Sequence, residues 1–193
     1  MERSVQPPPR LAALILAAGF SSRMGRFKPL LPMNGDSVVS HVVRTFRQAA
    51  IERIGVVIGY NAEQIKPVVC ELGVEAITNP DYESGMYSSV QAGIASLPSE
   101  VDACFLLPVD IPLVRSATIV ALAERFAAEQ APITYPRFGG QRGHPPLVSR
   151  ALFAEILAGK GDGGLRALLT NHQRTASDVD VLDGGVVLDM DTP

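Results

Sequence analysis

The chain of 193 residues is 47% hydrophobic and 19% charged, with a formal net charge of −3. This composition excludes an intrinsically disordered chain and supplies enough apolar residues for the core of one domain. The mildly acidic balance argues against a nucleic-acid-binding protein, which needs a basic face, and no apolar run reaches the roughly 18 residues of a membrane span. We therefore expect neither nucleic acid nor a membrane as a partner.

Apolar segments and helical patterns alternate after the first ten residues. We predict them, in chain order, as strand 11–17, helix 37–50, strand 53–58, helix 61–72, strand 74–78, helix 86–96, strand 103–107 and helix 116–130. Asn61 and Ser116 are suited to cap the helices that they begin. The alternation predicts an α/β fold, a Rossmann-like, three-layer α/β/α domain with a mostly parallel sheet.

The pattern changes beyond Pro132 to shorter apolar segments and glycine-rich turns, with a predicted helix near 150–157. We interpret residues 132–170 as an excursion of the same domain that covers the acceptor side of the site. The last residues, VVLDMDTP, are predicted as a final strand that runs into a loop. The predicted organisation is therefore a flexible, proline-containing leader at 1–10 and a single domain at 11–193.

Two features bear on the compartment in which the protein works. The N-terminal residues lack the apolar stretch of a secretory signal. Cys70 and Cys104 lie in separate apolar segments, and we interpret each as a buried free thiol. The missing signal and the sparse cysteines predict a cytoplasmic protein.

Residues 14–28, LILAAGFSSRMGRFK, carry the strongest functional signal. An apolar strand stops at Gly19, and a loop of small and basic residues leads to Arg23, Gly25 and Lys28. Glycine lets the backbone approach a ligand, successive N–H groups form an anion nest, and the two cations add charge. The loop predicts a triphosphate site, although it is neither a Walker loop nor a GxGxxG dinucleotide fingerprint.

The same segment matches the signature LAAGxSxRMGxxK at Leu16, Ala17, Ala18, Gly19, Ser21, Arg23, Met24, Gly25 and Lys28. It resembles the molybdenum cofactor cytidylyltransferase family, the MobA/MocA-like nucleotidyltransferases. The resemblance implies a GT-A-like nucleotidyltransferase fold in which Arg23 and Lys28 are catalytic and hold the β- and γ-phosphates. It also implies that the smaller motif residues bind the nucleotide: Leu16, Ala17, Ala18, Gly19, Ser21 and Gly25.

Two segments bear on recognition of the nucleoside. By resemblance, cytidylyl-transferring members carry LAAG and guanylyl-transferring members LAGG, so the methyl group of Ala18 favours CTP, by about 1–3 kcal/mol. Residues 79–93 resemble the nucleobase and ribose site, because Gly85, Ser88 and Ser89 offer open backbone and small hydroxyls at the start of a helix. We interpret Ser84 as a cap of that helix.

Asp110 follows the predicted strand 103–107 in LLPVDIPLV, on the same rim as the phosphate loop. Nucleotidyl transfer needs neutralised phosphate charge, and Mg²⁺ held by one or two carboxylates is the usual device. We therefore predict that Asp110 is a catalytic Mg²⁺ ligand; the alternative is an Asp that accepts bonds from loop N–H groups. The resemblance implies Asp191, directly before the Thr-Pro pair, as the second ligand, with Asp189 as the weaker candidate.

The glycine-rich segment 139–146, GGQRGHPP, contains two residues that could meet an anionic acceptor, Arg142 and His144. Its GHP triplet, and GDGGLRALL at 161–169, match the cofactor cytidylyltransferases. We therefore predict Arg142 and His144 as acceptor-binding residues.

Together these features predict transfer of CMP from CTP to the terminal phosphate of molybdopterin, the organic part of the molybdenum cofactor, with release of pyrophosphate and Mg²⁺ as the cofactor. An apo molybdenum hydroxylase would then receive the product. Two alternatives stay open: a nucleotidyltransferase that acts on a sugar or polyol phosphate, and a maturation partner that binds the finished cofactor with little catalysis. An oxidoreductase is disfavoured, because no nicotinamide or flavin fingerprint is present.

Overall fold

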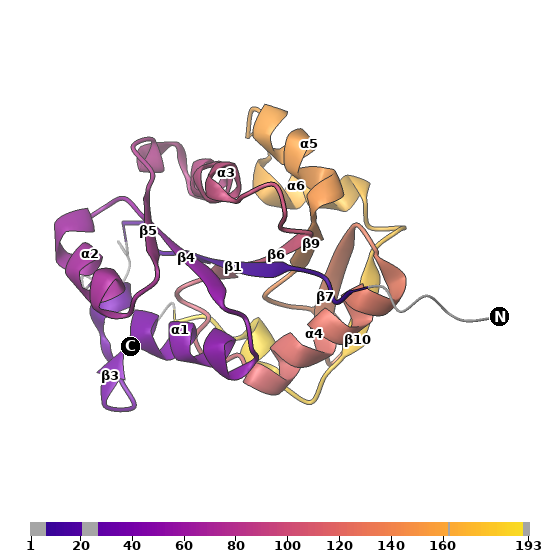
Figure 1. The fold of residues 1–193 in the computed structure, drawn as a ribbon, viewed down its shortest axis with the longest axis horizontal. Helices are drawn as coiled ribbons and strands as arrows, with labels where there is room; N and C mark the ends of the chain where they lie inside the picture. The colour runs from indigo at the N-terminus through magenta and orange to yellow at the C-terminus, as the bar shows by residue number, and fades with distance from the viewer. Residues whose placement is uncertain (1–6, 21–26, 162, 191–193) are drawn as a thin grey trace.

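The computed structural model describes residues 7–20, 27–161 and 163–190 (Figure 1). Its strands are β1 (Leu11–Leu16), β2 (Pro32–Met33), β3 (Asp36–Ser37), β4 (Arg53–Ile58), β5 (Glu75–Thr78), β6 (Ala103–Pro108), β7 (Ile133–Phe138), β8 (Gln141–Arg142), β9 (Leu147–Ser149) and β10 (Ser177–Asp180). Its helices are α1 (Val38–Gln48), α2 (Ala62–Glu71), α3 (Met86–Ser96), α4 (Ser116–Glu129), α5 (Phe153–Ala158) and α6 (Gly164–Asn171). Short 3₁₀ turns lie at Lys28–Leu30, Tyr82–Ser84, Arg150–Leu152 and Gly184–Val187.

Over the described residues, eight strands form one sheet in the order β10-β7-β9-β6-β1-β4-β5, with β8 paired to β7. Strands β5, β4, β1 and β6 run parallel, whereas β9 is antiparallel to both β6 and β7. The predicted mostly parallel sheet is thereby confirmed. The antiparallel strand falls beyond Pro132, where the sequence pattern changes, and it joins residues 132–170 to the main sheet.

Helices cover both faces of the sheet, as predicted from the βα alternation (Figure 1). Because successive side chains of a strand point to opposite faces, Ile15 packs with Phe46 on the α1, α2 and α4 face, and Leu14 packs with Val90 on the α3, α5 and α6 face. Strand β1 is buried on both faces, which explains its unbroken apolar sequence.

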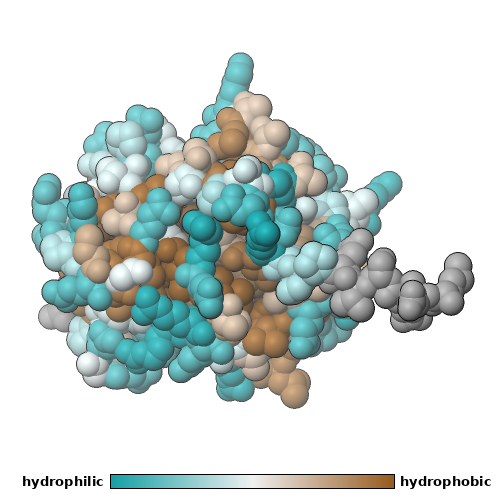
Figure 2. All heavy atoms as spheres, in the orientation of Figure 1, coloured by the Kyte–Doolittle hydropathy of each residue, from teal (hydrophilic) through white to brown (hydrophobic). Residues whose placement is uncertain are grey.

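The outer surface is mixed in character. The face shown in Figure 2 is covered mainly by hydrophilic side chains, with apolar side chains visible between them. Within the described residues, none of the helices combines the length and hydropathy that crossing a membrane would require.

One local prediction holds in part and three are wrong. Asn61 occupies the N-cap position of α2, as predicted, but it adopts the left-handed conformation (φ 54°) and its side chain makes no capping hydrogen bond in the described part of the chain. Ser116 is the first residue of α4 and not its cap, since the carboxylate of Asp183 accepts from the N–H of Arg115 at that helix end. Ser84 lies in a 3₁₀ turn, so Gly85 takes the N-cap position of α3. Cys70 is exposed on α2, whereas Cys104 is buried in β6, as predicted.

The predicted final strand is also wrong over its described residues, 186–190. Residues Gly184–Val187 form a 3₁₀ turn, and the chain continues to Met190 without strand pairing among the residues that the structure describes. The last strand is instead β10, which lies beside β7 in parallel. Two consecutive glycines, Gly184 and Gly185, favour the turn because they weaken an extended strand.

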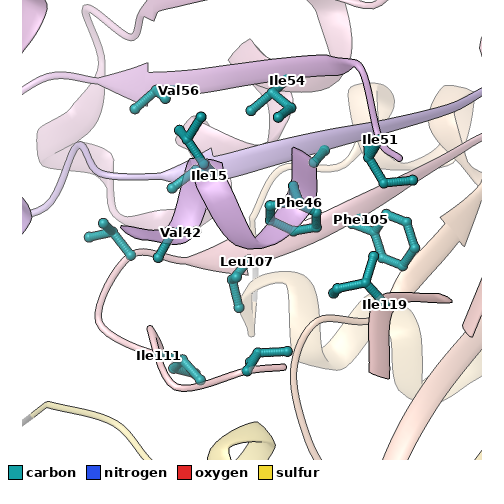
Figure 3. Packing of buried hydrophobic residues seen from close by; sticks show 14 of the residues in the cluster. Ile15, Val42, Phe46, Ile51, Ile54, Val56, Phe105, Leu107, Ile111 and Ile119 are labelled. Carbon is teal, nitrogen blue, oxygen red and sulfur yellow. The ribbon is translucent and has the colours of Figure 1, made fainter. Parts of the chain in front are cut away.

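We expect the change Phe46→Ala to lower the free energy of unfolding by about 3–5 kcal/mol, because it opens a cavity in a packed core. Phe46 is fully buried, and its ring lies 5.7 Å from that of Phe105, centroid to centroid (Figure 3). Urea unfolding would measure the change. Leu182→Ala is the control, since Leu182 is 94% exposed, and its value should stay near that of the wild type. Equal values for both variants would contradict the packing described here.

Candidate active site

The site lies at the carboxyl ends of β1 and β6, which are paired so that Leu16 and Pro108 are in register. The loop after β1 is tied to its neighbours through backbone hydrogen bonds: Ala17 N–H donates to Val57 O (2.9 Å) and Tyr60 N–H to Ala18 O (3.1 Å). On the other side, Val109 N–H donates to Leu16 O (3.1 Å). These bonds fix the two loops that face each other across the site.

A cavity of about 420 Å³ opens between these loops. It is lined by Leu16, Ala17, Ala18, Gly19, Phe20, Lys28, Pro29, Tyr82, Glu83, Gly85, Met86, Ser89, Pro108, Val109 and Asp110. Four stretches of the chain therefore meet, 16–20, 28–29, 82–89 and 108–110, and eight of the residues singled out in the sequence lie in one lining: Leu16, Ala17, Ala18, Gly19, Lys28, Gly85, Ser89 and Asp110.

The charged centre of the cavity is a pair formed by Lys28 and Asp110. The ammonium Nζ lies 3.4 Å from the carboxylate Oδ2, and the two side chains are 8% and 31% exposed. Lys28 belongs to the 3₁₀ turn Lys28–Leu30, and Asp110 follows β6, so residues 82 positions apart meet here. A buried cation beside a more exposed carboxylate can hold a phosphate oxygen and a metal ion next to each other.

Four predicted site residues lie outside the described residues: Ser21, Arg23, Gly25 and Asp191. For Asp191 the preceding residue is informative, because Met190 N–H donates to the backbone carbonyl of Asp110 (2.8 Å). No group of three or more potential metal-ligating side chains is present among the residues that the structure describes. One or two carboxylates completed by substrate phosphates are the usual ligand set for Mg²⁺, and Asp110 fits such a set.

The start of α3 shows how Ser88 and Ser89 differ. The side-chain amide of Asn79, itself 2% exposed, donates to Ser88 Oγ (2.9 Å) and Ser89 Oγ (3.0 Å). Ser88 Oγ also lies 2.8 Å from both Asp81 O and Gly85 O, and it lies outside the described lining of the cavity, whereas Ser89 is part of that lining. The sequence analysis missed Asn79, although its place directly after β5 was a usable signal.

An aromatic group at the cavity was also missed. Phe20, 46% exposed, lies with its ring centroid 5.2 Å from that of Tyr60 and 5.5 Å from that of Tyr82. Tyr82 packs closely over Gly59, where an added Cβ would lie 2.6 Å from the Tyr82 Cβ. Phe20 and Tyr82 both line the cavity, so they can contact a planar ring.

The two predicted acceptor residues are placed differently. The guanidinium of Arg142 on β8 donates to both carboxylate oxygens of Asp178 (2.7 and 3.2 Å) and lies 4.6 Å from the Tyr135 ring centroid. Arg142 is outside the described cavity lining. His144 is close enough to Asp110 for its carboxylate to affect the imidazole, and its backbone N–H donates to Val186 O (2.8 Å). His144, like Arg142, is outside the described cavity lining, and Arg142 is held in an ion pair with Asp178.

Burial lowers the pKa of His144 below the usual value of 6.5, an effect that the negative charge of Asp110 partly opposes. The unfolded chain therefore binds more protons than the folded chain once the pH falls below about 6.5, and stability should be lost toward acid pH. When the pH is lowered from about 7.5 to 5.5, we expect the free energy of unfolding of His144→Gln to fall by less than that of the wild type. Urea unfolding at both pH values would measure this difference. Equal decreases in the two proteins would contradict a neutral, buried imidazole at position 144. His41 and His172 are present in both proteins, so their contributions cancel in the comparison.

The family model described as the MobA-like NTP transferase domain matches residues 13–176. The chain belongs to this family. The match includes the predicted phosphate loop, the Lys28–Asp110 pair and the start of α3. The sequence-based resemblance to MobA/MocA-like nucleotidyltransferases is thereby confirmed, and a nucleotidyltransferase family supports an enzyme.

Several curated proteins resemble the chain. The molybdenum cofactor cytidylyltransferase of Escherichia coli is 28% identical over 181 residues, 93% of this chain and 90% of that protein. The bifunctional protein GlmU of Rhizorhabdus wittichii is 32% identical over 91% of this chain, but the match spans only 38% of GlmU. The nicotine blue oxidoreductase of Paenarthrobacter nicotinovorans is 28% identical and covered to 93%, with 95% of this chain aligned.

Solved structures confirm the predicted nucleotidyltransferase fold. Rv0371c of Mycobacterium tuberculosis has a TM-score of 0.84 and 27% identity, with 97% of this chain and 95% of that chain aligned. A second structure of Rv0371c, a complex with manganese, has a TM-score of 0.79 and 24% identity, with 95% and 94% aligned. Divalent metal is therefore present in at least one protein of this fold.

Proposed function

We propose that this protein transfers CMP from CTP to the terminal phosphate of molybdopterin, releasing pyrophosphate. The observation that carries the proposal is the Lys28–Asp110 pair, 3.4 Å apart in the cavity that the Ala17–Gly19 backbone borders. The similarity to the Escherichia coli cytidylyltransferase over 93% of the chain supports the choice of acceptor. A pure cofactor carrier would need neither a buried lysine nor a paired carboxylate at this position.

In the proposed reaction, an oxygen of the acceptor phosphate attacks the α-phosphorus of CTP. The bond from that phosphorus to the bridging β-phosphate oxygen breaks, and its electron pair leaves with pyrophosphate. The attacking phosphate is already an anion at neutral pH, so no general base is required, and positioning and electrostatics supply the rate. Lys28, together with Arg23, holds the β- and γ-phosphates and stabilises the charge that develops on the leaving group.

Asp110 and Asp191 are proposed to hold Mg²⁺. When bound, the metal ion neutralises phosphate charge and orients the reacting oxygens. The hydrogen bond from Met190 N–H to Asp110 O supports this pairing, because Asp191 is the next residue in the chain. The manganese complex of a structural relative supports a divalent cation at this kind of site. Asp189, exposed and two residues before Asp191, is the weaker candidate.

CTP is proposed as the nucleotide. Ala18 lines the cavity, and by resemblance to the family an alanine here in place of glycine favours cytosine over a purine; Gly85 and Ser89 line the same cavity and offer open backbone and a hydroxyl for the base and ribose. The rings of Phe20 and Tyr82 are available for stacking against the base. Leu16, Ala17 and Gly19, with Ser21 and Gly25 of the same motif, complete the proposed nucleotide site, and Ser88 supports it through Asn79.

The acceptor is proposed to bind on the side of Arg142 and His144. His144 Nδ1 is buried without a hydrogen-bond partner among the described residues, which leaves it available to a ligand, and the charge of Asp110 acts on the imidazole. Arg142 would have to exchange its Asp178 partner for the acceptor phosphate. We place the reaction in the cytoplasm, where an apo molybdenum hydroxylase would receive the product.

The deciding experiment measures pyrophosphate release with Mg²⁺ from CTP and from GTP, each with and without molybdopterin. We expect release from CTP alone, and only when the pterin is present. Release from GTP would keep the reaction and overturn the choice of base. Release with a sugar phosphate in place of the pterin would overturn the acceptor, and nucleotide binding without any release would favour a carrier.

A further inference from the structure

We propose that Asp183, which lies outside the cavity lining, is a positioning residue that fixes the loop carrying Asp110. It does so by anchoring residues 183–190, here called the strap, against that loop. The inference rests on the proposed function, because it assigns Asp183 a role in the metal site of that function. Three contacts along the strap carry it: one at its start, one in its middle and one at its end.

At the start of the strap, Asp183 is buried, with 3% of its surface exposed. Its Oδ2 accepts from Arg115 N–H (2.8 Å) and from Thr118 Oγ1 (2.7 Å), and its Oδ1 accepts from Gly185 N–H (3.1 Å). The Arg115 guanidinium lies 3.9 Å away and balances part of the charge. A carboxylate 68 residues away thus caps the N-terminus of α4, where negative charge is favourable.

In its middle, the strap fits so closely that two positions accept only glycine. A Cβ on Gly185 would lie 2.2 Å from Leu113 O, and a Cβ on Gly143 would lie 2.4 Å from Val186 O. Both neighbours are backbone atoms, which cannot move aside as a flexible side chain can. Val186 is fully buried, and its carbonyl accepts from His144 N–H (2.8 Å). The strap is therefore wedged between the loop after β6 and the segment 143–144.

At its far end, Met190 N–H donates to Asp110 O (2.8 Å). Asp110, Leu113 and Arg115 all belong to the connection between β6 and α4. The strap thus contacts this single connection at three points, and the last of them holds the backbone of the residue whose carboxylate pairs with Lys28. Asp183 itself lies outside the described cavity lining, so it acts on the site through the strap.

The test uses the full-length protein and compares the wild type with Asp183→Ala, Asp183→Asn and Gly185→Ala. NMR hydrogen exchange would follow the Met190 amide, and electron paramagnetic resonance would measure Mn²⁺ affinity with CTP bound. We expect Asp183→Ala to exchange the Met190 amide at least tenfold faster and to bind Mn²⁺ at least tenfold more weakly. CTP affinity without metal should stay within twofold of the wild type.

The other variants sharpen the result. Gly185→Ala should reproduce both effects, because it lifts the strap while Asp183 is intact. Asp183→Asn should be intermediate, since an amide keeps one acceptor oxygen for α4 but loses the negative charge. Asp180→Ala is the matched control: it removes an exposed carboxylate of nearby β10, paired to Arg137 of β7, and should leave exchange and Mn²⁺ affinity unchanged.

Each contrary outcome has a distinct meaning. If Asp183→Ala lowers only the melting temperature, while Met190 exchange and Mn²⁺ affinity stay at wild-type values, Asp183 is a helix cap and the positioning role is wrong. If the wild type binds no Mn²⁺, the proposed metal site fails and the positioning role falls with it, whatever the exchange data show. If the wild type binds Mn²⁺ but Asp183→Ala exchanges the Met190 amide at the wild-type rate, the positioning role alone is overturned.

Discussion

Replacement of Lys28 by alanine is expected to lower kcat/KM for pyrophosphate release from CTP by about 10³-fold, close to 4 kcal/mol of transition-state stabilisation. The ammonium is 8% exposed in the cavity wall, and water cannot replace it fully there. Its charge becomes more important as negative charge develops on the leaving pyrophosphate. Steady-state kinetics with Mg²⁺, CTP and molybdopterin would measure the loss.

Two further lysine variants make this result specific. Lys28→Met keeps most of the length and apolar volume of the side chain, so a loss equal to that of Lys28→Ala identifies the charge as the cause. Lys66→Ala removes an exposed lysine on α2 and should leave kcat/KM unchanged. If Lys28→Met retained wild-type kinetics while folded, the phosphate-binding role of Lys28 would be wrong.

Asp110→Asn is expected to lower kcat by about 10²–10³-fold, because it removes the carboxylate charge while keeping the shape of the side chain. The variant should need a higher concentration of Mg²⁺ for half-maximal rate, and CTP binding in the absence of metal should be preserved. Titration of Mg²⁺ at saturating CTP would separate these quantities. Asp180→Asn, an exposed carboxylate in an ion pair with Arg137, is the control.

The double variant Lys28→Ala, Asp110→Asn tests whether the two residues act together. Since their charged atoms are 3.4 Å apart and are proposed to hold one triphosphate, the combined loss should be smaller than the sum of the two single losses in free energy. Strictly additive losses would indicate two independent sites.

If the single variant Asp110→Asn showed the same dependence on Mg²⁺ as the wild type, Asp110 would not be a metal ligand. Its carboxylate would then have the alternative role predicted from the sequence, accepting hydrogen bonds from loop N–H groups.

The centre of the parallel sheet could be predicted because β1, β4 and β6 are buried on both faces and their sequences are almost entirely apolar. Strands β1, β4 and β6 were placed to within one residue at each end. The cap residues were harder to predict, because the free backbone N–H groups at the start of a helix can donate to a residue distant in sequence. Asp183 provides that cap for α4, while Ser116, the residue that local rules favoured, is the first helical residue.

The sequence by itself determined the family, through the motif at residues 14–28, and the placing of Lys28, Asp110 and the start of α3 at one end of a parallel sheet. These follow from local features: glycine spacing, apolar runs and the rule that strand ends share a rim. Only the tertiary structure decided which polar groups already have a hydrogen-bond or ion-pair partner within the protein. Arg142 pairs with Asp178, Ser88 bonds to Asn79, and the strap returns to Asp110, because such partners are chosen by contacts between distant segments and leave no pattern along the chain.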